Sequence, residues 1–175
     1  MDARLNRFGL TVFLFAEGML FAGVVGGFIV LRAGAAVWAA PGLRDAVLAL
    51  SGRLAAAPLL LVVGSAGLLF DPRGRRAVVR ALAAGLFFLG LLAWAWARLR
   101  GEEIWFGTGG LFTSTFFALT GLHGLHVAAS LGFLGRAVPE GRKAGRPAAA
   151  LFWHFGTVCG IAAYALLFGT LYLAK

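Results

Sequence analysis

Five long apolar stretches, separated by short polar segments, constrain this chain more than any other feature of its sequence. As α-helices, these stretches are long enough to cross the hydrocarbon core of a bilayer, which is about 30 Å thick. A helix also satisfies its own backbone hydrogen bonds, as a segment in lipid must. The sequence therefore predicts an all-α integral membrane protein, a single domain over residues 1–175 built as a bundle of five transmembrane helices. The predicted spans are residues 8–31, 54–70, 77–97, 109–134 and 148–173.

The composition excludes a soluble fold. Hydrophobic residues make up 61% of the chain and charged residues only 13%, whereas soluble domains carry about 25% charged residues. The formal net charge is +9. The basic residues lie between the apolar stretches and do not alternate with aromatic residues, so we expect no nucleic-acid binding. The single cysteine, Cys159, has no CxxC or Cys/His spacing around it, and the sequence predicts no metal site.

The basic residues predict an orientation in the membrane. If the N-terminus is cytoplasmic, ten of the sixteen Lys and Arg residues flank the cytoplasmic side, including those of the segments 71–76 and 136–146. Cytoplasmic loops carry an excess of Lys and Arg. We therefore expect a cytoplasmic N-terminus and an external C-terminus.

Glu17 is the one acidic residue within the apolar stretches. It lies nine residues into the first stretch, roughly 14 Å along a helix, and therefore near the middle of the membrane. An unpaired charge at that depth costs several kcal/mol. We expect Glu17 to be protonated or hydrogen-bonded across helices, with a histidine of the fourth stretch as a candidate partner. Proton handling and attachment of one helix to another are equally supported roles at this point.

Three histidines are the other polar groups of consequence. His123 and His126 lie three residues apart on one helix face, and His154 follows Trp153 in the last stretch. A metal centre would need further ligands, and a haem b would need histidines on two helices at matching depth, which His126 and His154 fit poorly. We expect the imidazoles to bond to carbonyls, hydroxyls or a neighbouring subunit. A haem b-binding membrane anchor of a respiratory complex stays an alternative.

Two GxxxG pairs predict close helix packing, within the chain or against a partner: Gly23 with Gly27, and Gly156 with Gly160. Such pairs let helix backbones approach each other in lipid. The chain shows no nucleophile–base pair, phosphate-binding loop or two-metal carboxylate cluster, and no inverted repeat of the kind found in transporters. We therefore expect it to have no catalytic centre of its own.

Three blocks of sequence resemble subunit III of the haem-copper terminal oxidases, in its short five-helix bacterial form. The first block is FLFAEGMLFAGVVGGFIVLR, the second is STFFALTGLHGLHV and the third is AAALFWHF. Glu17 falls on the buried glutamate of that family. His123 and His126 fall on the histidines of its T-G-x-H-G-x-H helix, and Trp153 and His154 on its W-H-F motif.

This resemblance implies a non-catalytic subunit of a cytochrome c or quinol oxidase in an aerobic respiratory chain. Such a complex reduces oxygen and pumps protons in the bacterial cytoplasmic membrane. Haem and copper are then expected in the partner subunits I and II and none in this chain, which stabilises subunit I and supports its proton uptake. Structural phospholipid is a further expected ligand. After Phe155 the chain departs from the family pattern, and an accessory subunit of a nitric oxide reductase is the alternative.

Overall fold

The computed structural model describes residues 3–39, 42–108, 110–139 and 145–173, and these form five α-helices. The helices are α1 (Ala3–Gly34), α2 (Leu43–Phe70), α3 (Arg75–Gly101), α4 (Gly110–Ala137) and α5 (Arg146–Leu173). All five are long and apolar enough to cross a membrane, and the described residues contain no strand. The predicted all-α architecture with five spans is confirmed.

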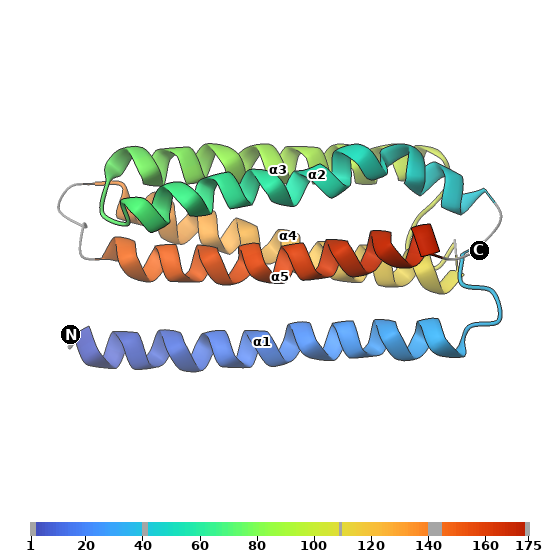
Figure 1. Ribbon diagram of the computed structural model, residues 1–175, viewed down its shortest axis with the longest axis horizontal. Coiled ribbons are helices and arrows are strands. Elements are labelled where there is room, and N and C mark those ends of the chain that lie inside the picture. The colour runs from blue at the N-terminus through green and yellow to red at the C-terminus, as the bar shows by residue number, and fades with distance from the viewer. Residues whose placement is uncertain (1–2, 40–41, 109, 140–144, 174–175) are drawn as a thin grey trace.

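The helices lie side by side along one long axis, and the two ends of the chain lie at opposite ends of the bundle (Figure 1). Helices α2 to α5 form a four-helix bundle, and α1 runs along one side of it. We call the end at which α1 begins the N-side; it also holds the α2–α3 turn, the end of α4 and the start of α5. Which side of the membrane the N-side faces stays a prediction. Residue 109 and the middle of the basic segment 136–146 lie outside the described residues.

The helices are longer than the apolar stretches that predicted them. The second stretch predicted a helix from Leu54 with Pro58 in its first turn. This is wrong, because α2 begins at Leu43 and Pro58 lies in its interior. Hydropathy ends a span at charged residues such as Asp45 and Arg53, whereas a helix in water or at the membrane interface continues through them.

Trp153 joins α5 to the α2–α3 pair. Its indole is 2% exposed and donates a hydrogen bond from Nε1 to the Leu61 carbonyl, 3.3 Å away. A Cβ atom on Gly64 of α2 would lie 2.8 Å from this indole, and one on Gly85 of α3 would lie 3.0 Å from it. Glycine on two helices therefore provides the space that a large side chain on the third one fills.

Helix α1 is much less buried than the others. In its most apolar window 11% of the residues are buried, against 50% in α4 and in α5. Near its end, Phe28 packs against Trp38 with ring centroids 5.1 Å apart, and Trp38 packs against Phe112 of α4 at 5.8 Å. The Phe112 N–H also donates to the Trp38 carbonyl. Most of the remaining surface of α1 faces outward.

Candidate functional site

Glu17 and His126 form a hydrogen bond that joins α1 to the four-helix bundle. The contact is between Oε1 of Glu17 on α1 and Nδ1 of His126 on α4. The other ring nitrogen of His126, Nε2, lies 3.0 Å from the Phe152 carbonyl of α5. The imidazole also stacks on the Phe152 ring, with centroids 4.2 Å apart. The cross-helix bond expected between Glu17 and the fourth span is present, and it brings α1, α4 and α5 together at one level.

The hydrogen-bond partners of His126 determine where the protons of this pair are. A carbonyl only accepts, so Nε2 of His126 carries a hydrogen and donates it to Phe152. In a neutral imidazole Nδ1 is then bare, and Glu17 must be the protonated donor. In the alternative, imidazolium and carboxylate, the pair is also neutral overall. Either way one proton lies between Glu17 and His126, and no net charge is buried in the hydrocarbon, where it would be costly.

The glycine pair of α5 makes room for the histidine pair of α4. His123, which is fully buried, has its Nε2 3.1 Å from the Gly156 carbonyl. A Cβ atom on Gly156 would overlap the ring of His126, and one on Gly160 would overlap the ring of His123. In an α-helix a side chain lies over the turn that precedes it. These two glycines therefore expose the carbonyls four residues earlier, which the two imidazoles bind.

The glycine pair of α1 behaves differently. A Cβ atom on Gly23 or Gly27 would meet nothing within 4 Å, and both residues are exposed. Their predicted role in packing is therefore not fulfilled within the part of the chain that the structure describes. A contact with a partner stays a prediction for this pair.

His154 belongs to a separate polar group between α2 and α5. Its Nδ1 lies 3.0 Å from the Ser65 hydroxyl, which is 3.0 Å from the Thr157 hydroxyl. The three histidines thus bond to carbonyls, a hydroxyl and a carboxyl group. His126 uses both ring nitrogens inside the chain, so neither is directed at His154 across a shared plane. This arrangement favours structural histidines over a haem b pair.

Arg146 is a buried cation that sequence reasoning counted only among the loop charges. It is fully buried at the first position of α5. Its guanidinium donates from Nε to the Ala137 carbonyl and from Nη2 to the Val138 carbonyl, each at 2.8 Å, and from Nη1 to the Arg73 carbonyl. It therefore holds the end of α4 and the α2–α3 turn together on the N-side. Nothing in the sequence distinguishes it from its basic neighbours.

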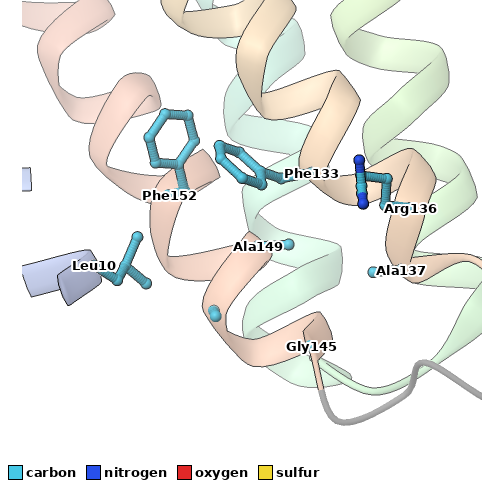
Figure 2. A pocket seen from close by; sticks show the side chains of 8 residues that line it. Leu10, Phe133, Arg136, Ala137, Gly145, Ala149 and Phe152 are labelled. Atoms are coloured by element: carbon cyan, nitrogen blue, oxygen red, sulfur yellow. The ribbon is translucent and has the colours of Figure 1, made fainter. Parts of the chain in front are cut away.

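Cavities lie along α1 where it meets the bundle. The one shown in Figure 2 has a volume of about 460 Å³; Leu10 of α1, Phe133 of α4 and Phe152 of α5 line it, and Arg136 lies at its N-side end. A second, of about 410 Å³, is lined by Glu17 and His126 together with apolar side chains. A third, of about 510 Å³, lies between α1 and α5 and is lined by Gly18, Met19, Leu151 and Phe155, among others. Within the described residues, no three His, Cys, Asp or Glu side chains gather as a metal site would require.

Fold and site together define a multi-pass membrane protein with five helices, whose interior polar side chains bond mainly to one another and to helix carbonyls. The chain is 28% identical over 181 residues to cytochrome c oxidase subunit 3 of the cyanobacterium Synechocystis sp., covering 94% of this chain and 75% of that protein. This similarity supports its assignment to the cytochrome c oxidase subunit III family.

Two animal relatives support this assignment over a shorter region. The proteins named cytochrome c oxidase subunit 3 from the lancelets Branchiostoma lanceolatum and Branchiostoma floridae are each 36% identical over 92 residues. These matches cover 48% of this chain and 34% of each lancelet protein. No family model matches the chain.

Proposed function

We propose that this chain is the non-catalytic subunit III of a haem-copper terminal oxidase in a bacterial cytoplasmic membrane. The names of its relatives support this, and one structural observation carries it. The three sequence blocks that resemble subunit III meet at one place, where Glu17 of the first binds His126 of the second and His126 binds the Phe152 carbonyl of the third. In this proposal haem and copper belong to subunits I and II, and this chain packs against them.

The Glu17–His126 pair supports a role in attachment rather than in proton conduction. A proton relay needs groups that both accept and donate, but the N–H of His126 ends on a carbonyl, which only accepts. The second carboxyl oxygen of Glu17 has no hydrogen-bond partner among the described residues. The pair therefore offers no onward path among the described residues. We propose that the chain supports proton uptake by subunit I through correct assembly, with Glu17 holding α1 in place.

The cavity between α1, α4 and α5 suits a structural phospholipid. Its walls are largely apolar, and the exposed guanidinium of Arg136 lies at the N-side end (Figure 2). An acyl chain would pack on Leu10, Phe133 and Phe152, and the lipid phosphate would pair with Arg136, because arginine binds phosphate through two parallel hydrogen bonds. A lipid here would fill space that α1 leaves beside the bundle.

Purification of the tagged chain from its native membrane tests the proposed function. In mild detergent it should retain a large haem-copper subunit, identified by mass spectrometry, and the complex should show the optical bands of reduced haem. After dissociation, the fraction that holds this chain alone should show no haem band. Retention of a nitric oxide reductase subunit, or haem on the isolated chain, would contradict the proposal.

The substitution Glu17→Gln separates attachment from proton transfer. Glutamine cannot release a proton, but its amide can donate a hydrogen bond to Nδ1 of a neutral His126, in the place of a protonated acid. We expect the Glu17→Gln complex to assemble and to take up protons like the wild type. An assembled complex with impaired proton uptake would show that Glu17 itself handles protons.

A further inference from the structure

The hydrogen-bond chain that starts at Thr157 determines which ring nitrogen of His154 carries the hydrogen. The Thr157 hydroxyl lies 3.0 Å from the Trp153 carbonyl, which only accepts, so Thr157 gives its single hydrogen there. The contact between Ser65 and Thr157 therefore uses the hydrogen of Ser65. Ser65 can then only accept from His154, so the N–H of that imidazole is at Nδ1. In the neutral ring Nε2 is a bare acceptor.

This bare nitrogen lies where lipid offers it nothing to bind. His154 is eight residues from the start of α5, about 12 Å along the helix axis and inside the candidate membrane span Arg146–Leu171. The side chains one turn before and after it, Leu151 and Val158, are 49% and 66% exposed, so this face of α5 points out of the bundle. His154 is itself half-buried, and no described residue bonds to its Nε2. Acyl chains have no donor, and an unpaired acceptor in lipid is costly.

We propose that His154 is a docking point at which Nε2 accepts a hydrogen bond from a donor side chain on a transmembrane helix of subunit I. The inference rests on the proposed function for the identity of that partner. The donor would be a hydroxyl, an indole N–H or an amide. The apolar cavity between α1 and α5 continues this surface, since Leu151 and Phe155 line it beside Gly18 and Met19. It would receive neighbouring apolar side chains of the same partner helix.

A second copy of this chain, docked through the same face, would not supply the donor. In a two-fold contact centred on His154 the two rings would meet, and both present acceptors. The exposed neighbours Leu151, Val158 and Ile161 have no donor in their side chains. These features favour a different chain as the partner.

Two substitutions of His154 in the intact complex distinguish the proposed bond of Nε2 to the partner, the outer bond, from the bond of Nδ1 to Ser65, the inner bond. The amide nitrogen of asparagine takes the place of Nδ1, so His154→Asn keeps the bond to Ser65 and loses the outer acceptor. The amide oxygen of glutamine takes the place of Nε2, so His154→Gln keeps the outer acceptor and loses the inner bond. From measured hydrogen bonds between helices in membranes, we expect His154→Asn to weaken retention of subunit I by roughly threefold to tenfold. His154→Gln should stay close to the wild type.

The measurement is the amount of subunit I that co-purifies with the tagged chain as detergent concentration rises. Equal retention by both variants would overturn the docking point, and so would greater loss with His154→Gln. Mass spectrometry of the retained large subunit tests the proposed function separately. A photo-crosslinking residue at Val158, with His154 unchanged, should join this chain to subunit I. Crosslinks solely to a second copy of this chain would overturn the inference.

Discussion

Helix α1 and the four-helix bundle α2–α5 stay in place by different means. The bundle is held by close contacts at glycine, by the inserted Trp153 and by several interior hydrogen bonds. Helix α1 buries few side chains, lies beside cavities and has a polar contact in mid-helix, between Glu17 and His126. In lipid no hydrophobic effect drives helices together. A helix with so little packing therefore depends on a specific polar bond, which explains an acid in the middle of an apolar run.

The largest effect on stability is expected from Arg146, which holds the end of α4 and the α2–α3 turn together on the N-side. Arg146→Ala leaves the carbonyls of Arg73, Ala137 and Val138 without their charged donor. Hydrogen bonds to charged groups contribute about 1.5–3 kcal/mol each, so we expect the free energy of unfolding to fall by at least ~3 kcal/mol. Unfolding with SDS in mixed micelles measures it. The control is Arg76→Ala, because Arg76 is exposed at the same end. An equal loss of unfolding free energy in both variants would show that the three hydrogen bonds of Arg146 do not stabilise the N-side.

The two GxxxG pairs give a direct test of the difference between α1 and the bundle. Gly160→Ala would force a Cβ atom into the buried ring of His123, and overpacking costs about 1–3 kcal/mol. Gly27→Ala in α1 would meet nothing within 4 Å, so we expect almost no change in the stability of the chain. The same unfolding measurement compares them. Similar losses for both substitutions would remove the distinction between the packed pair and the exposed pair.

These glycines also show how far the sequence could predict the structure. Hydropathy located all five helices, since the free energy of transferring a long segment into lipid is determined largely by its residue types. It could not say which GxxxG pair is packed, because that depends on what the neighbouring helix presents: His123 and His126 face Gly156 and Gly160, and no histidine faces Gly23 or Gly27. The pattern within one helix does not contain this information.

The polar residues were predictable to different degrees. Glu17 was expected to bond across helices, because its depth in the membrane requires a partner, and His126 was one of few candidates. The burial of Arg146 was not predictable, because its three acceptors are backbone carbonyls of Arg73, Ala137 and Val138. Carbonyls occur at every position, so only the folded backbone reveals which ones converge on a side chain.

The Glu17–His126 bond is expected to have a moderate energy and a large structural effect. A double-mutant cycle with Glu17→Ala and His126→Phe should give a coupling free energy of about 1 kcal/mol, as for other hydrogen bonds between membrane helices. Distances between spin labels on α1 and α4 should broaden in Glu17→Ala, while distances between α2 and α5 stay the same. Glu17→Gln, which keeps a donor, is the control. An unchanged α1–α4 distance in Glu17→Ala would show that the aromatic contacts hold α1 without the polar bond.

The smallest effect is expected from Ser65→Ala, which removes two hydrogen bonds of the serine hydroxyl within the bundle. Ser65 bonds to His154 and Thr157, but α2 is also fixed to α5 by the Trp153 indole against Gly64 and its bond to Leu61. We expect a loss of about 0.6 kcal/mol in the free energy of unfolding and no change in α2–α5 spin-label distances. If Ser65→Ala displaced α2 as Glu17→Ala displaces α1, the bundle would depend on single polar bonds too. The contrast between a packed helix and an attached one would then be lost.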